Sequence, residues 1–160
     1  MNPRTWLVAS ILAVLTFTGC ATTPQPTNLA ETAAAKPELS TFSKLAHEAG
    51  FADTLKGPGP YTLFAPTDEA FKSVPPAMMA KLAADKTLLK SVLSYHVLEN
   101  KVAGADVKNG SVKTMQGANI ALSKSGTFVT VEDAVVTQPD VVATNGVVHV
   151  IDRVLMPPLK

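Results

Sequence analysis

The stretch TLFAPTDEAF, residues 62–71, places a hydroxyl, two carboxylates and a proline between two apolar runs. The apolar run Tyr61–Ala65 is compact, which is typical of a buried strand. Pro66 fits the exit of such a strand, because proline has no backbone N–H to donate to a neighbouring strand. Thr67 can accept the free N–H groups of a starting helix, and acidic residues suit the positive first turn that follows. The stretch therefore predicts a strand that passes directly into a helix.

The acidic pair Asp68-Glu69 is also a candidate for part of an active site. An active site built from two carboxylates needs both acids to face one cleft with different pKa values. Neighbouring residues in the first turn of a helix point about 100° apart, which suits that arrangement poorly. We therefore interpret Thr67 and Asp68 as residues that start a helix.

The order of patterns along the chain predicts an α+β domain. Apolar residues at helical spacing follow Ser40, the expected cap of that helix, and Asp85 is the expected cap of a later one. From His96 onward the segments are short, rich in β-branched residues and separated by turn residues, which is typical of strands. Asn145-Gly146 is the strongest hairpin signal, because both residues tolerate positive φ. Helices followed by a run of strands indicate an α+β fold for residues 38–160.

The N-terminal segment has the features of an export signal. Arg4 precedes a 12-residue apolar run, Trp6 to Phe17, and small residues follow it. A membrane-spanning helix needs roughly 20 residues, so this run is too short to be an anchor. We expect residues 1–19 to be a signal peptide. Residues 20–37 are rich in Ala, Thr and Pro and lack aromatic side chains, so we expect a flexible tether there.

Cys20 is the only cysteine, so an intrachain disulfide is impossible. A single thiol after Thr-Gly at the end of the apolar run resembles a bacterial lipobox, which would be cleaved after Gly19 and acylated on Cys20. Phe17 departs from this pattern, which prefers an aliphatic residue at that place. Ala21, rather than an aspartate, favours the outer membrane by analogy with known lipoproteins. The alternative is a plain secretory peptide, with a secreted or periplasmic protein.

The charge of the chain does not favour binding to nucleic acid. Removal of residues 1–19 deletes one basic residue, Arg4, and leaves 13 basic and 13 acidic residues. The sequence contains no basic stripe that would hold a phosphate backbone. We therefore expect no nucleic-acid partner.

The histidines are the main candidates for chemistry, and they are His47, His96 and His149. Their spacing offers no pair at i,i+4, and acylation would remove the thiolate of Cys20, so we expect no metal site. We expect His47 to lie in solvent. His96, next to Tyr95, is expected to be half-buried and bonded to backbone. Alternation places His149 on one face of a sheet, where we expect it to pack.

The remaining polar residues form no catalytic set. Asp152 and Arg153 are expected to pair with other charged groups at strand ends, in ordinary ion pairs worth under about 1 kcal/mol. The sequence has no G-x-S-x-G motif for a serine nucleophile, no P-loop and no dinucleotide fingerprint. We therefore expect neither an enzyme nor a cofactor.

Three stretches together carry a family resemblance: TLFAPTDEAF (62–71), LLKSVLSYHVL (88–98) and NGVVHVIDRVLMPP (145–158). In order and spacing they resemble the first conserved block, the Tyr-His segment and the second conserved block of fasciclin, or FAS1, domains. The resemblance covers about residues 38–159 and implies a FAS1 fold, a wedge of two β-sheets flanked by several α-helices. It implies that polar residues of these blocks support the fold or an interaction surface: Thr67, Asp68, Tyr95, His96, Asn145, Gly146, His149 and Asp152.

The resemblance also implies adhesion or binding of extracellular partners. We expect a monomeric, non-enzymatic lipoprotein of the cell envelope that binds a protein or glycan. The sequence has no Arg-Gly-Asp, so integrin binding is not expected. The alternative is a carrier of an apolar small molecule, a carotenoid or lipid, with Met78, Met79 and Met115 lining a groove. A hydrolase would need His96 or His149 beside a nucleophile in an open cleft.

Overall fold

The computed structural model describes residues 27–158, and the predicted signal peptide and Cys20 lie outside this range. Its helices are short, with the longest covering ten residues. None of the described helices is long and apolar enough to cross a membrane. The helical elements are α1 (Leu29–Ala34), η1 (Pro37–Leu39), α2 (Ser40–Glu48), α3 (Ala52–Leu55), α4 (Asp68–Lys72), α5 (Pro76–Ala84) and α6 (Lys86–Tyr95).

The strands of the described part form one continuous seven-stranded sheet in the order β2-β1-β7-β6-β5-β4-β3. The central strands β1 and β7 are parallel, and both are buried along nearly their whole length, which explains their largely apolar sequences. Leu98 at the end of β2 forms an isolated bridge with Thr114, which follows β3, so the two edges of the sheet meet. The strands are β1 (Tyr61–Pro66), β2 (Val97–Leu98), β3 (Gly110–Lys113), β4 (Asn119–Ser125), β5 (Phe128–Val131), β6 (Ala134–Ala143) and β7 (Gly146–Ile151).

Strand β6 divides this sheet into two halves. Its first two residues pair with β5, and residues from Val136 onward pair with β7. The register shifts on both sides of Gln138, and such bulges bend a strand and increase its twist. The predicted α+β fold is confirmed, and the two predicted sheets are the halves of one bent sheet that share β6.

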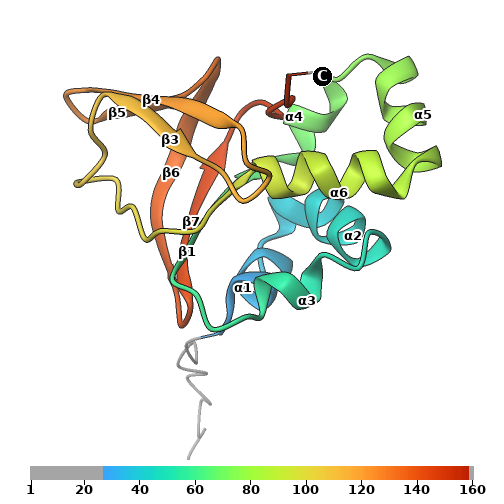
Figure 1. Ribbon diagram of the computed structural model, residues 1–160, viewed down its shortest axis with the longest axis horizontal. Coiled ribbons are helices and arrows are strands. Elements are labelled where there is room, and N and C mark those ends of the chain that lie inside the picture. Colours follow the sequence, from blue (N-terminus) through green and yellow to red (C-terminus); the bar gives the residue numbers. More distant parts are fainter. Residues whose placement is uncertain (1–26, 159–160) are drawn as a thin grey trace, which may run out of the picture.

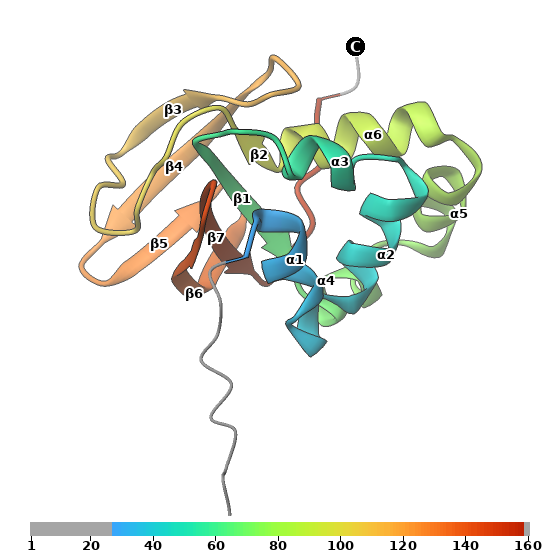
Figure 2. The same cartoon turned by 90° about the horizontal axis from the view of Figure 1, so that it is seen from below.

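Two apolar cores lie on opposite faces of strand β1. Figures 1 and 2 show the helices gathered on one side of β1 and β7, with β3, β4 and β5 on the other side. Leu63 and Ala65 pack into the core under the helices, whereas Phe64 points into the core enclosed by the curved half of the sheet. This alternation is the ordinary period of two of a strand that is buried on both faces.

The prediction that the folded part begins at residue 38 is wrong. Asn28 caps α1 by accepting a hydrogen bond from the Glu31 N–H at 3.0 Å, and Leu29 is completely buried in the core under the helices. The Lys36 Nζ donates a hydrogen bond to the side-chain oxygen of Gln138 in β6 at 2.8 Å. The composition of this segment could not form a core alone, but Leu29 fills a place in a core that the rest of the chain supplies. The predicted tether therefore loses residues 27–37, and residues 20–26 lie outside the described range.

The β6–β7 hairpin lies where the sequence predicts it, but for a different reason. The turn consists of Thr144 and Asn145, because Ala143 already pairs with Gly146. Neither Asn145 nor Gly146 is among the residues with positive φ, so tolerance of positive φ does not explain them. Gly146 is instead needed for a close approach, since a Cβ there would overlap the backbone oxygen of Tyr61 in β1.

Candidate interaction site

An open groove of about 720 Å³ lies at the end of the β6–β7 hairpin that is opposite its turn. One wall is formed by α4 and the residues after it, a second by the β5–β6 turn, and a third by the chain that leaves β7. In Figure 1 this region is where α4 and the C-terminal end lie together, far from the turn of the hairpin. The groove is lined by residue 70 and by residues 73–75, 132–134 and 152–156.

Two carboxylates on the groove walls are bound to backbone. Asp152 accepts a hydrogen bond from the Val135 N–H at 2.7 Å, which joins the chain after β7 to the start of β6. Glu132 accepts one from the Ala121 N–H at 2.8 Å. The predicted ion pairs of Asp152 and Arg153 with other strand-end groups do not form within residues 27–158, where the salt bridges involve other residues. The backbone contact explains the difference for Asp152, because it occupies one oxygen of the carboxylate that an ion pair would have used.

Thr67 and Asp68, beside this groove, stabilise two different helices. The Thr67 Oγ1 accepts a hydrogen bond from the Ala70 N–H at 3.2 Å and caps α4. Asp68 accepts one from the Ser40 Oγ at 2.7 Å and one from the Thr41 N–H at 2.8 Å, so it binds the start of α2. Burial opposes ionisation of Asp68, but these hydrogen bonds outweigh it and hold the pKa of Asp68 below its ordinary value. Ser40 is therefore not the cap that the sequence predicts; Asp68 supplies the acceptor.

Replacement of Asp68 by alanine is expected to lower the free energy of unfolding by about 1 kcal/mol, because the first turn of α2 loses its acceptor. Glu69→Ala is the matched control, since Glu69 carries the same charge on the next residue and binds only Lys72, in an exposed pair. The control is expected to change stability little. Urea unfolding of both variants measures the difference. Equal losses in the two variants would contradict the capping role of Asp68.

His96 is buried, with 1% of its surface exposed, and both of its ring nitrogens bind backbone. The Leu155 N–H donates to Nε2 at 3.0 Å, so the proton lies on Nδ1, which donates to the Val92 oxygen at 2.8 Å. Burial lowers the pKa of His96 to about 4, against a smaller opposing effect of the bond to Val92. Because Leu155 lines the groove, His96 fixes the position of one groove wall. Tyr95, its neighbour, donates to the Asn119 oxygen at 3.3 Å.

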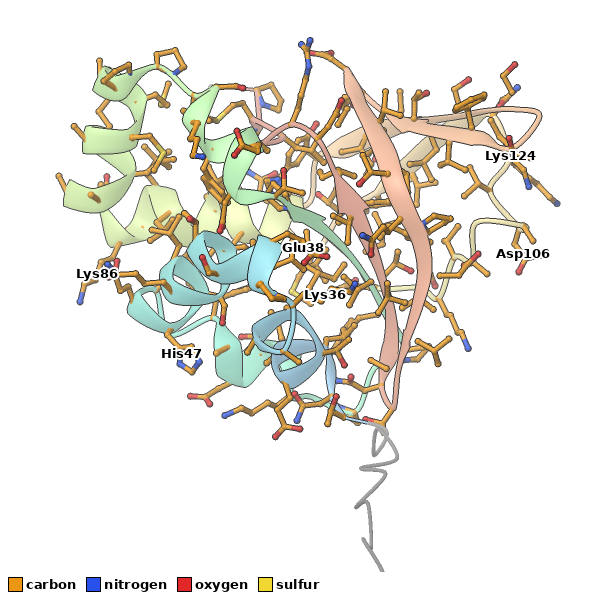
Figure 3. The ribbon with its side chains drawn as sticks, turned by 180° about the vertical axis from the view of Figure 1, so that it is seen from behind. Lys36, Glu38, His47, Lys86, Asp106 and Lys124 are labelled. Carbon is orange, nitrogen blue, oxygen red and sulfur yellow. The ribbon has the colours of Figure 1, made fainter. Side chains whose placement is uncertain are left out.

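His149 is equally buried and ties β7 to two other segments. The Asp140 N–H donates to Nδ1 at 3.2 Å, and Nε2 donates to the Val102 oxygen at 2.8 Å. The ring stacks on Phe64, with centroids 5.6 Å apart. Burial lowers the pKa of His149, and the bond to Val102 and the charge of Asp140 oppose that effect. With both imidazoles enclosed, neither His96 nor His149 can act as a general base in an open cleft. His47, by contrast, points into solvent (Figure 3).

Asn145 joins three segments that are far apart in the sequence. Its amide nitrogen donates to the Leu55 and Gly57 oxygens, both at 2.7 Å, and its amide oxygen accepts from the Leu29 N–H at 2.9 Å. Its backbone oxygen accepts from the Tyr61 N–H. Asn145 therefore holds α1, the chain after α3 and the start of β1 around the hairpin turn.

Comparison with known protein families identifies the family of this domain. The sequence model of the Fasciclin domain matches residues 37–157, which include both buried histidines and all three groove walls. The chain belongs to the fasciclin domain family. The family resemblance that the three sequence stretches suggest is therefore confirmed.

Relatives of this fasciclin domain are found in several organisms. The protein sll1735 of Synechocystis sp. is 37% identical over 130 residues, which are 81% of this chain and 97% of that protein. The cell surface glycolipoprotein MPB83 of Mycobacterium bovis is 36% identical over 137 residues, which are 82% of this chain and 61% of that protein. A solved FAS1 domain pair from the insect cell adhesion molecule Fasciclin I is similar with a TM-score of 0.64 and 20% identity, over 82% of this chain and 51% of that chain. That similarity shows the fold alone.

Most predicted block residues of this fasciclin domain support its fold, and among them only Asp152 lines the groove. Sequence reasoning missed Glu132 and Asp133 as groove residues, although they lie between two β-branched segments where a turn was visible. Within residues 27–158, no group of three or more His, Cys, Asp or Glu side chains is placed to hold a metal ion. The methionines expected to line a carrier groove, Met78, Met79 and Met115, pack against the core under the helices.

Proposed function

We propose that this fasciclin domain is a non-enzymatic adhesion or partner-binding protein of a bacterial cell envelope, anchored by lipid on Cys20. The lipobox-like sequence that ends at Cys20 supports the anchor, and Ala21 after it favours the outer membrane. The relative named as a cell surface glycolipoprotein supports a location at the cell surface. The proposed partner is a protein or a glycan.

The groove is the observation that carries this proposal. It is open and combines exposed charges of both signs, from Asp133 and Arg153, with the side chain of Met156, which is 38% exposed. A surface of this kind suits a partner that brings both polar and apolar groups, whereas a carrier for an apolar molecule needs an enclosed apolar cavity. Because Asp152 and Glu132 are held by backbone, the walls are already formed before a partner arrives.

Attachment of cells to surfaces tests this function. A strain that lacks the protein is expected to attach or aggregate less than its parent, and the intact chain should restore the behaviour. A double variant of the groove, Arg153→Glu with Met156→Ser, is expected to remove most of the restoration, because it reverses the charge and removes the apolar contact. Lys86→Glu is the matched control, since Lys86 is exposed at the start of α6 (Figure 3) and does not line the groove.

Two results would contradict the proposal at different levels. Normal attachment of the deletion strain would contradict the adhesion function. Full restoration of attachment by the groove variant would contradict the groove as the binding surface, but it would still be consistent with an adhesion function. Mass spectrometry of the mature N-terminus checks the anchor separately, with a diacylglyceryl group on Cys20 as the expected result.

A further inference from the structure

The described chain enters the fold beside the turn of the β6–β7 hairpin. The Thr144 N–H donates to the Thr27 oxygen at 2.9 Å, and the Leu29 N–H donates to the Asn145 Oδ1 at 2.9 Å. Figures 1 and 2 show the first described residues at this end of the molecule. Any N-terminal attachment to a membrane therefore acts on the turn end of the hairpin.

The chain between Cys20 and this entry point is short. Seven residue steps separate Cys20 from Thr27, and a fully extended chain of that length spans at most about 25 Å. The tether predicted from the sequence extended to residue 37 and would have reached roughly 60 Å. Because Thr27 is bonded to the hairpin turn, the turn end of an anchored domain stays close to the lipid surface.

The exposed residues of this end suit a lipid surface. Val142 is 71% exposed and is the most exposed large hydrophobic residue of the described part. Thr144 in the hairpin turn, and Pro58 and Pro60 in the loop before β1, are also exposed and carry no charge. The loop with the two prolines touches the hairpin turn, since a Cβ on Gly59 would overlap the Asn145 oxygen. We define Pro58, Pro60, Val142 and Thr144 as the turn-end surface.

We propose that the turn-end surface rests on the lipid headgroups, so that the groove points away from the membrane. The proposal rests on the lipid anchor of the proposed function. The groove lies at the other end of β6, a bent strand of ten residues that separates it from the turn by at most about 30 Å. Val142 and the prolines contact the interface, while the groove is presented to partners outside.

Fluorescence quenching in vesicles tests this orientation. The full chain with its native lipid is placed in vesicles of phosphatidylethanolamine and phosphatidylglycerol that contain a lipid with a spin-labelled headgroup. Val142→Cys carries the fluorophore on the turn-end surface, and Met156→Cys carries it in the groove. Phe128→Cys is matched to Val142 in exposure, at 69% against 71%, but lies at the β4–β5 hairpin. Quenching is expected to be severalfold stronger for Val142→Cys than for either control.

The possible outcomes test the proposed orientation and the lipid anchor separately. Equal quenching at all three positions, with the protein still bound to vesicles, would overturn the orientation and leave the anchor standing. A chain that does not stay with the vesicles and carries no acyl group would overturn both. Thermal unfolding of the labelled variants checks that each one is folded, and all three positions are exposed enough to accept a cysteine.

Discussion

Alanine in place of Gly146 is expected to lower the free energy of unfolding by about 3 kcal/mol or more. The added Cβ would overlap the Tyr61 backbone oxygen and lie 2.9 Å from the carbonyl carbon of the same residue. Gly146 and Tyr61 form the first pair of the parallel β1–β7 ladder, so the two central strands would have to separate. Both strands are buried, and the strain cannot be relieved by moving a flexible side chain. Urea unfolding followed by circular dichroism measures the loss.

Thr144→Ala is the matched control for this substitution. Thr144 lies in the same hairpin turn, is exposed, and keeps its backbone bond to Thr27 whatever its side chain. The control is expected to stay within about 0.5 kcal/mol of the unmodified protein. If Gly146→Ala were equally harmless, β1 and β7 would have to lie farther apart at this point than the structure places them.

Local signals in the sequence predicted much of this fold correctly. Thr67 follows β1 and caps α4, and Asp85 caps α6 by accepting from two N–H groups of its first turn. Each of these interactions involves residues at most three positions apart. A short stretch of sequence contains all partners of such an interaction, so its chemistry can be inferred without knowing the rest of the fold.

The failures share one physical cause, which is contact between distant segments. Asp68 binds the start of α2 at Ser40, 28 positions away, and nothing near Ser40 in the sequence indicates this acceptor. Leu29 is bonded to Asn145, 116 positions away, and composition alone cannot reveal that its segment packs on an existing core. The role of Gly146 depends on the position of β1, which cannot be inferred from the Asn-Gly hairpin signal.

The groove also could not be predicted from the sequence, because it is formed by three separate segments. Asp152 lies in a stretch that carries the family resemblance, so the sequence singled it out. Asp133 lies in a turn between two strands, and the pairing of the start of β6 with the end of β7 brings it to the C-terminal segment. A single sequence predicts elements in this protein better than it predicts surfaces that form between them.

Acidification is expected to destabilise the protein through His96. Burial lowers the pKa of His96 from an ordinary value of 6.5 to about 4, so the unfolded chain binds a proton at a pH where the folded chain does not. Stability due to neutral His96 is therefore complete above the unfolded pKa and is lost as the pH falls from 6.5 toward 4. The loss is about 2 kcal/mol by roughly pH 5 and about 3 kcal/mol by roughly pH 4. Burial also lowers the pKa of His149, which acts in the same direction.

Urea unfolding between neutral pH and about pH 5 tests this effect, because carboxylates with ordinary pKa values near 4 contribute little in that range. His96→Gln is expected to be less stable at neutral pH and to show a much flatter pH profile. His47→Gln removes an exposed imidazole and is expected to leave the profile unchanged. An unchanged slope in His96→Gln would contradict the assignment. Protonation of His96 in the folded protein also removes the acceptor for the Leu155 N–H, so the groove wall that Leu155 forms should loosen and attachment should weaken only as the pH approaches about 4.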